Sequence, residues 1–151
     1  MMSPKLKIKR LERNGEKPPM PFYASKGAAG LDLTYFGDEE ITLIPGEIEK
    51  LNTGICVEIP EGYVGLIYIR SSLGAKHGIT LANSVGVIDC DYRGELMVFI
   101  TNTSSVKHTI RPGERFAQLV LTPCTQFPIE ECDELSETER GTGGFGSTNK
   151  K

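Results

Sequence analysis

The segment PEGYVGLIYI, residues 60–69, is typical of a β-strand that follows a tight turn. Its Pro-Glu-Gly start predicts the turn, and the run after it is rich in β-branched and aromatic residues, which favour strands. Similar short apolar runs, several with period-two alternation, recur along the chain. They lie at residues 5–11, 55–59, 79–82, 85–88, 95–102 and 115–122. The pattern predicts an all-β domain built as a sandwich, a jelly roll or a barrel.

The chain shows little helical signal and one change of composition. No window keeps helical periodicity for the ~12 residues that an independent helix needs. The one helical candidate is a turn or two at residues 72–76. A chain of 151 residues fits one domain, and a Gly-rich stretch begins just after Glu139. We therefore expect a β domain at residues 1–138 and a mobile C-terminal arm at residues 139–151.

Composition argues against several classes of function. A net charge of -3 gives no electrostatic footprint for nucleic acid. No apolar run approaches the ~20 residues of a membrane helix, and the basic N-terminus lacks the hydrophobic core of a secretory signal. The four cysteines form no C-x-x-C pair, and His77 and His108 stand alone in the sequence, so neither disulfides nor a zinc site is indicated. We expect a cytoplasmic protein with no nucleic-acid or membrane partner; a nuclear location stays open if the source is eukaryotic or viral.

The stretch NSVGVIDCDYRGE, residues 83–95, carries the strongest chemical signal. An apolar strand runs directly into Asp89 and Asp91. In an extended chain two such carboxylates share a face and repel, so the pair needs a cation, a proton or an arginine nearby. An acidic hairpin tip explains Asp91, but it does not explain an acid directly after apolar Val87 and Ile88. A functional role for Asp89 is favoured.

Three weaker clusters are open to structural explanations. Arg70-Ser71-Ser72 follows an apolar strand, where a helix start beside an arginine can bind phosphate, although an ordinary serine N-cap explains it equally well. Asp32 stands between two leucines of an expected strand, and a solvated acid is the simpler interpretation. Arg115 and Gln118 lie within an apolar strand, where an arginine that pairs with a buried acid competes with a substrate contact.

The C-terminal stretch RGTGGFGST, residues 140–148, contains a literal G-x-G-x-x-G. It neither follows a strand nor opens a helix, so it does not predict a dinucleotide site. It offers many free backbone amides, Arg140 for an anionic group and Phe145 for stacking on a base. A disordered linker explains the glycines and leaves that lone phenylalanine unexplained.

Taken together and in this order, the five clusters from Ala29 to Thr148 resemble the five motifs of the trimeric dUTPase family. The combination of residues 83–95 with residues 140–148 is the most specific part of the resemblance. It implies a β jelly roll or distorted β-barrel with a flexible Gly-rich tail, assembled as a homotrimer with active sites at subunit interfaces. It also implies Mg²⁺-dependent hydrolysis of dUTP to dUMP and pyrophosphate by water attack at the α-phosphorus. That activity limits uracil in DNA and supplies dUMP for dTMP synthesis.

The resemblance assigns roles to individual residues. Asp89 is similar to the general base that activates water and also binds the deoxyribose 3′-hydroxyl. Tyr92 is similar to the residue that packs under the sugar and leaves no space for a ribose 2′-hydroxyl. Asp32 would hold Mg²⁺ through a coordinated water, while the triphosphate holds most of the metal's coordination sphere. Backbone groups near the uracil edge would come from Asn83, Gly86, Val87 and Ile88.

The remaining carried-over roles concern phosphate and the pocket wall. The phosphate-binding motif corresponds to Arg70, Ser71 and Ser72, and Ser72 stands where the family often has glycine. Gln118 would lie near the phosphates and the water, and Met97 would line the pocket. In the tail, the expected substrate contacts are Arg140 on the γ-phosphate, Phe145 stacked on uracil, and Gly146 and Ser147 on phosphates.

Other functions are weighed beside this one. The same scaffold could carry an added regulatory protein-binding role. A relative that deaminates dCTP would need an additional acidic residue in the pyrimidine site. A plain jelly-roll binding module leaves Asp89 and the Phe145 tail unexplained.

Overall fold

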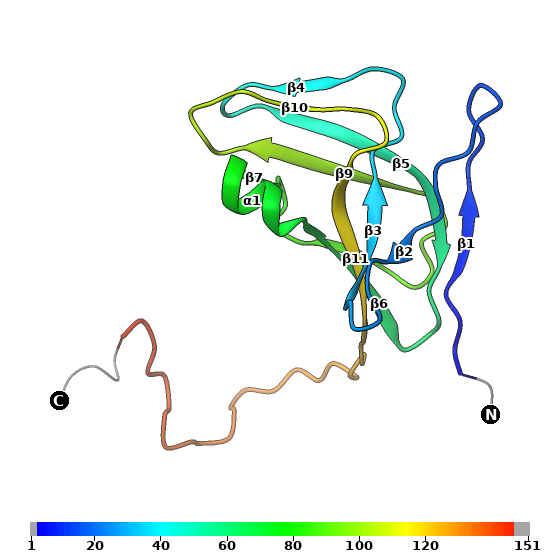
Figure 1. Cartoon of the computed structure of the whole chain (residues 1–151). Helices are drawn as coiled ribbons and strands as arrows, with labels where there is room; N and C mark the ends of the chain where they lie inside the picture. Colours follow the sequence, from blue (N-terminus) through cyan, green and yellow to red (C-terminus); the bar gives the residue numbers. More distant parts are fainter. Residues whose placement is uncertain (1–2, 147–151) are drawn as a thin grey trace.

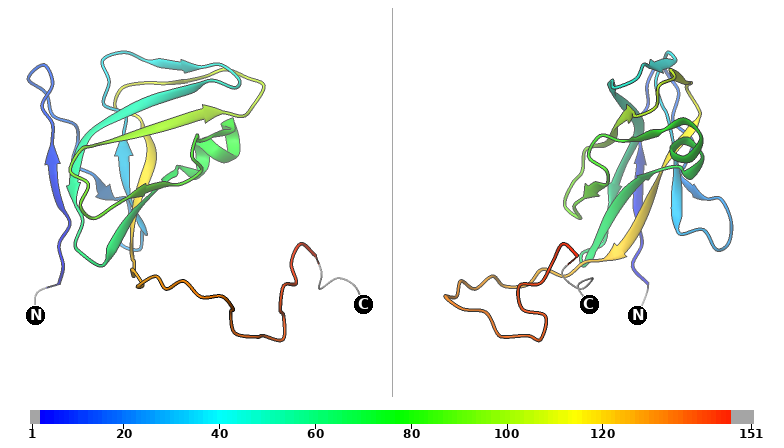
Figure 2. Two further views of the ribbon diagram at one scale, coloured as in Figure 1. Left: turned by 180° about the vertical axis from the view of Figure 1, so that it is seen from behind. Right: turned by 90° about the vertical axis from the view of Figure 1, so that its left-hand side faces the viewer.

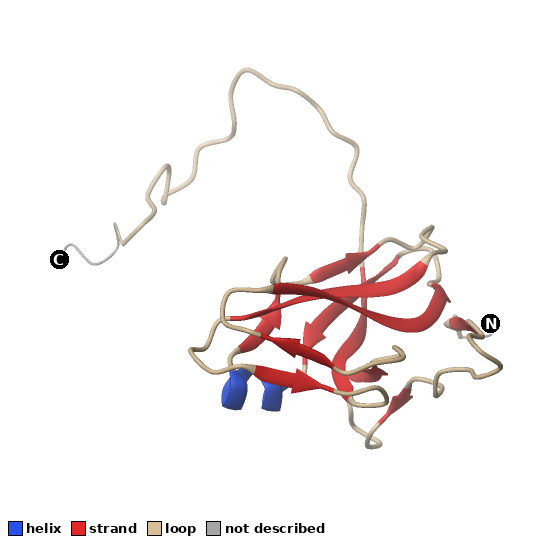
Figure 3. Ribbon diagram, turned by 90° about the horizontal axis from the view of Figure 1, so that it is seen from above, coloured by secondary structure: helices blue, strands red, loops and turns tan. Residues whose placement is uncertain are grey.

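The computed structural model describes residues 3–146, and nearly all of its regular structure is β-strand (Figures 1 and 3). The strands are interrupted by one short helix in this part of the chain, and their predominance confirms the all-β prediction. In chain order the elements are β1 (Lys7–Arg10), β2 (Phe22–Tyr23), β3 (Gly30–Thr34), β4 (Ile41–Leu43), β5 (Ile48–Glu58), β6 (Tyr63–Ile69), α1 (Ser71–His77), β7 (Ile79–Leu81), β8 (Gly86–Ile88), β9 (Glu95–Asn102), β10 (His108–Ile110) and β11 (Arg115–Pro123).

Within residues 3–146 the strands form three antiparallel sheets. A four-stranded sheet has the order β1-β5-β9-β7, and a five-stranded sheet has the order β2-β3-β11-β6-β8. The third sheet pairs only β10 with β4. Strands that are distant in the sequence are therefore neighbours, as expected for a jelly roll or a distorted barrel.

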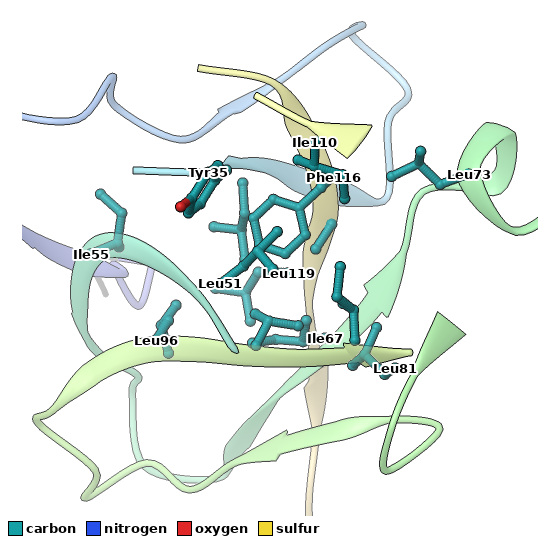
Figure 4. Packing of buried hydrophobic residues seen from close by; sticks show 14 of the residues in the cluster. Tyr35, Leu51, Ile55, Ile67, Leu73, Leu81, Leu96, Ile110, Phe116 and Leu119 are labelled. Carbon is teal, nitrogen blue, oxygen red and sulfur yellow. The ribbon is translucent and has the colours of Figure 1, made fainter. Parts of the chain in front are cut away.

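The core lies where the inward faces of the two larger sheets meet (Figure 4). In β9 the side chains of Leu96, Val98 and Ile100 are buried, while Met97 and Phe99 between them are exposed. Phe116 on β11 is fully buried at the centre of the cluster. The period-two alternation read from the sequence thus fixes which side chains of β9 face outward.

The bounds of β5 and α1 differ from the sequence prediction. β5 begins at Ile48 rather than near Ile55, because polar Glu49 and Thr53 occupy the same alternate positions as buried Leu51 while apolar Ile48 is exposed. Its pairing with β9 also shifts between Asn52 and Cys56, and such a bulge breaks the period of two. The helix covers Ser71–His77 and ends at Gly78, whose φ of 65° closes it in the left-handed conformation.

The C-terminal segment leaves the folded body after β11. The Cys124 amide donates to the Gly62 carbonyl at 2.8 Å. From there to Gly146 the described residues form no strand or helix, and the segment extends away from the sheets (Figures 1 and 2). Phe127 and Ile129 on this segment are almost fully exposed.

Candidate active site

A cavity of about 280 Å³ lies beside Asp89, between β8 and β9. Four further residues proposed from the sequence line it, namely Val87, Ile88, Tyr92 and Met97. The outward alternation of β9 adds Phe99, and the strand start adds Glu95 and Leu96. The cavity therefore combines an apolar wall with carboxylates at one end, which is the usual composition of a small-molecule site.

The turn after β8 fixes how Asp89 is presented. The Tyr92 amide donates to the Asp89 carbonyl at 3.1 Å, and Arg93 Nη1 donates to the Cys90 carbonyl at 2.6 Å. Residues 90 and 91 are in a turn. The assumption that Asp89 and Asp91 share the face of an extended strand is therefore wrong, since the chain bends between them. Both carboxylates are exposed, so no counter-ion is needed to hold them together.

Tyr92 folds back over the end of this turn. Its hydroxyl donates to the Glu95 carbonyl at 2.9 Å. A Cβ at Gly94 would overlap the Tyr92 ring, so glycine at this position is what lets the ring lie flat against the backbone. Tyr92 is 39% exposed and helps to line the cavity.

The segment before β8 is also tightly turned. The Val85 amide donates to the Asn83 carbonyl at 2.7 Å, and Ser84 has a φ of 64°. Gly86 is buried against Ile67 of β6. β8 forms the end of the five-stranded sheet, and an edge strand presents backbone N–H and C=O groups on its open side.

A second cluster lies near the other end of β6. Gln118 on β11 is paired with Asp32 on β3 and with Tyr68 on β6. The Arg70 amide donates to the Phe116 carbonyl at 2.9 Å, and its guanidinium donates to the Arg115 carbonyl at 3.1 Å. Ser71 and Ser72 are exposed at the start of α1. Since the first amides of a helix have no partner within it, this end of β6 offers hydroxyls, amides and a guanidinium together.

Asp32 is bound to Arg115. The Arg115 Nη1–Asp32 Oδ2 distance is 2.8 Å, and the Asp32 side chain is only 11% exposed. The arginine also lies over the Phe22 ring, 5.9 Å from its centroid. The pairing of an arginine with a partly buried acid, one of the two explanations open for Arg115, is the contact observed.

Among residues 3–146, no group of three or more His, Cys, Asp or Glu side chains is arranged to hold a metal ion. A cation at this end of β6 would therefore take most of its ligands from a bound molecule. Asp32 has one carboxylate oxygen committed to Arg115, which leaves its other oxygen for a metal-bound water. Mg²⁺ fits such a site, because it keeps several waters and binds through one or two carboxylates plus phosphate oxygens.

The two clusters are far apart within one chain. β8 runs antiparallel to β6, with Ile88 opposite Gly65. Asp89 lies one residue beyond Ile88, and Arg70 lies five residues beyond Gly65, so about six strand steps of ~3.3 Å, roughly 20 Å, separate them. The structure therefore does not bring Asp89 and Arg70 together in a single copy.

The tail residues are not at either cluster. Arg140 Nε donates to the Gly143 carbonyl at 2.8 Å, which is a contact within the segment itself. Phe145 is fully exposed, and it and Gly146 lie on the part of the chain that projects away from the sheets (Figure 1). Ser147 lies outside the described residues.

Sequence reasoning missed three features around these clusters. Glu95 and Phe99 line the cavity, and the alternation of β9 could have placed Phe99 beside Met97. Arg13 reaches Glu95, a contact that no local pattern announces. The His77 and His108 rings lie with centroids 4.3 Å apart and planes tilted by 31°, and burial, with a smaller contribution from His77, lowers the pKa of His108.

No helix in the described part of the chain is long and apolar enough to cross a membrane. The dUTPase family model matches residues 16–149. A deoxyuridine 5'-triphosphate nucleotidohydrolase of Acinetobacter baumannii is 47% identical over 149 residues, covering 97% of this chain and 99% of the relative. The enzyme of the same name from Alcanivorax borkumensis is 47% identical over 140 residues, with 92% and 93% covered.

Solved structures agree with these matches. The Staphylococcus bacteriophage 80alpha dUTPase with dUPNHPP has a TM-score of 0.80 at 31% identity, covering 95% of this chain and 97% of that one. A dUTPase from phage phi11 of S. aureus, described with a structural Mg(II) ion, has a TM-score of 0.74 at 28% identity, covering 86% and 97%.

Proposed function

The chain belongs to the dUTPase family, and from that premise we propose that it hydrolyses dUTP to dUMP and pyrophosphate. The observation that carries the proposal is the cavity beside Asp89, walled by Tyr92 and Met97 at the turn between β8 and β9. The reaction limits uracil in DNA and supplies dUMP for dTMP synthesis.

Asp89 is the general base in this mechanism. Its carboxylate is at the end of the cavity, where it takes a proton from the water that attacks the α-phosphorus. The same group binds the deoxyribose 3′-hydroxyl. Tyr92, held by its hydrogen bond to the Glu95 carbonyl, lies under the sugar and leaves no room for a 2′-hydroxyl.

Backbone groups recognise the uracil ring of the substrate. The open edge of β8 and the turn before it supply N–H and C=O groups from Asn83, Gly86, Val87 and Ile88 to the edge of uracil. Cytosine presents a donor where uracil has an acceptor, so it leaves buried polar groups unmatched. A mismatch of that kind discriminates more strongly than the ~1–3 kcal/mol of one methylene in an apolar pocket.

The cluster near Arg70 holds the triphosphate. Arg70 and the Ser71 and Ser72 hydroxyls and amides bind phosphate oxygens, and Gln118 is near the phosphates and the attacking water. When bound, Mg²⁺ neutralises charge on the departing pyrophosphate, and Asp32 would hold it through water. In the tail, Arg140 binds the γ-phosphate, Phe145 stacks on uracil, and Gly146 and Ser147 donate to phosphates, so that closure of the tail excludes bulk water.

A complete site needs more than one copy. The roughly 20 Å between Asp89 and Arg70 along β6 is too long for both to act at one phosphorus in a single chain, so a second copy supplies one of them. The extended tail supports a third contribution, since it projects away from its own body. A homotrimer with active sites at its interfaces meets these requirements with closed symmetry.

The alternatives have less support. Deamination of dCTP needs a further free carboxylate in the pyrimidine site. The second carboxylate that lines the cavity, Glu95, is bound by Arg13 and by the Gly54 amide. An added regulatory role has no specific observation in its favour.

Pyrophosphate release with Mg²⁺, measured on dUTP, dTTP, dCTP and UTP, tests the proposal. Strong preference for dUTP is expected, and equal rates on the four nucleotides would refute it. Asp89→Asn should lower kcat about 10²–10⁴-fold and keep dUTP binding. The matched control is Asp91→Asn, in the same turn, which should stay within about threefold of the parent because it changes only an exposed side chain.

A further inference from the structure

We infer that Glu95, anchored by Arg13 of the N-terminal hairpin, is a positioning residue that sets Tyr92 against the sugar and thereby determines selectivity for deoxyribose. This inference rests on the proposed function. It assigns a role to the first residues of the chain, which carry none of the five sequence clusters.

The Glu95 carboxylate is held on three sides. Its Oε1 accepts the Gly54 amide at 2.7 Å, while its Oε2 forms an ion pair with Arg13 and lies 3.4 Å from Asn52 Nδ2. The Glu95 side chain is only 13% exposed. Charge-assisted hydrogen bonds of this kind, shielded from water, fix a side chain more firmly than a surface pair does.

The N-terminal hairpin holds Arg13 in place. The Arg13 and Glu16 backbones exchange hydrogen bonds of 2.8 and 2.9 Å around Asn14-Gly15, both with positive φ, the turn type that suits a tight hairpin. The guanidinium also donates to the Phe36 carbonyl at 2.9 Å and lies 5.4 Å from the centroid of the Phe36 ring. The position of Arg13 is therefore fixed by contacts other than its ion pair with Glu95.

The bulge in β5 completes the anchor. Gly54 is buried with a φ of 67°, and a Cβ there would meet the Phe36 ring, so only glycine turns its amide toward Glu95 without strain. Beside it, the fully buried Thr53 donates from Oγ1 to the Leu96 carbonyl at 2.7 Å. The bulge therefore forms hydrogen bonds to two successive residues at the start of β9, Glu95 and Leu96.

Glu95 connects these contacts to the substrate pocket. Its side chain carries the anchor, and its backbone carbonyl accepts the Tyr92 hydroxyl at 2.9 Å. It also lines the cavity next to Asp89. A shift of Glu95 therefore moves the support of the Tyr92 ring, and a ring that fits less closely against the sugar weakens the binding of dUTP and its discrimination from UTP.

The test compares Glu95→Gln, Arg13→Met and the double variant for kcat and KM on dUTP and UTP. Each single change should raise KM for dUTP about tenfold, leave kcat within about threefold, and lower the dUTP/UTP ratio of kcat/KM about tenfold. The double variant should be no worse than the worse single change, because both act through one contact. Arg13→Lys, which keeps the charge, should restore part of the selectivity.

Glu58→Gln is the matched control. It removes the carboxylate of another ion pair on β5, the exposed Lys7–Glu58 pair at 2.7 Å, and should change neither KM nor selectivity. Hydrogen exchange of the amides of residues 89–95, measured on the full chain, should be faster in Glu95→Gln and unchanged in Glu58→Gln.

Two outcomes separate this inference from the proposed function. If the parent chain shows no preference for dUTP, the proposed function itself fails. If the parent selects dUTP and both Glu95→Gln and Arg13→Met select it equally well, with or without a loss of thermal stability, the pair is structural only and the inference is overturned. Should Glu95→Gln not fold, Arg13→Met decides between the same two results.

Discussion

An equimolar mixture of Asp89→Asn chains and Arg70→Ala chains should regain activity that neither chain has alone. Each variant destroys one of the two clusters and leaves the other intact. Because about six strand steps, roughly 20 Å, separate Asp89 from Arg70 in one copy, the proposed mechanism takes the two residues of each active site from different copies. A mixed assembly then contains sites with both residues intact.

The size of the recovery follows from the geometry. In a closed ring with heterologous interfaces, each site takes Asp89 from one copy and Arg70 from another. With random exchange, each of these two residues is intact in half of the sites, so both are intact in about a quarter of them. Recovery should therefore reach about a quarter of the parent activity per chain.

The assay is pyrophosphate release from dUTP after the two chains are unfolded together and refolded. Asp89→Asn chains mixed with chains carrying both substitutions serve as the control, since every site then lacks the base. Native mass spectrometry verifies that mixed assemblies have formed. Mixed assemblies with no recovered activity would show that each site is built from one chain, and would refute a site shared between copies.

Three further perturbations test individual contacts. The pKa of His108 is lowered, chiefly by burial, so the unfolded chain binds more protons than the folded chain. The free energy of unfolding should therefore decrease as pH falls below about 6.5 and through the lower folded pKa. Chemical denaturation of His108→Gln should show a flatter pH dependence, and an unchanged slope would contradict this. Gly54→Ala should lower the free energy of unfolding by about 2–4 kcal/mol, whereas Gly46→Ala, with a φ of 84° but open space around it, should cost only about 1 kcal/mol; equal losses would mean that the contact with Phe36 is unimportant. Asp32→Asn should raise the Mg²⁺ concentration for half-maximal hydrolysis without abolishing the reaction, and an unchanged Mg²⁺ titration would remove Asp32 from the metal's surroundings.

The sequence predicts features that depend on neighbouring residues. Alternation along β9 correctly separates buried Leu96 and Ile100 from outward Met97, because side-chain direction in a strand has a period of two. Likewise, Asp89 directly after an apolar run points to the end of a strand, and the structure has a cavity there. These are local consequences of strand geometry.

Features set by long-range register escape the sequence. Arg13 and Glu95 are 82 residues apart, and only the placement of the N-terminal hairpin beside the β5 bulge brings them into contact. His77 and His108 stand alone in the sequence, and their rings are in contact in the fold. The distance between the Asp89 and Arg70 clusters also depends on register, since pairing β8 with β6 in a shifted register would change it by about 3.3 Å per residue.

In the proposed mechanism, the separation of the two clusters makes activity conditional on assembly. In that mechanism, a lone copy has Asp89 and the Tyr92 ring at one end of β6 and the phosphate-binding residues at the other, so it cannot align water with an α-phosphorus held at Arg70. Specific activity should therefore fall on dilution, at the concentration where light scattering shows the assembly dissociating. Because each site needs more than one copy, specific activity should fall more steeply with dilution than the folded fraction of the chain does. A dissociated chain that kept full specific activity would place both clusters in one copy, against the register observed between β6 and β8.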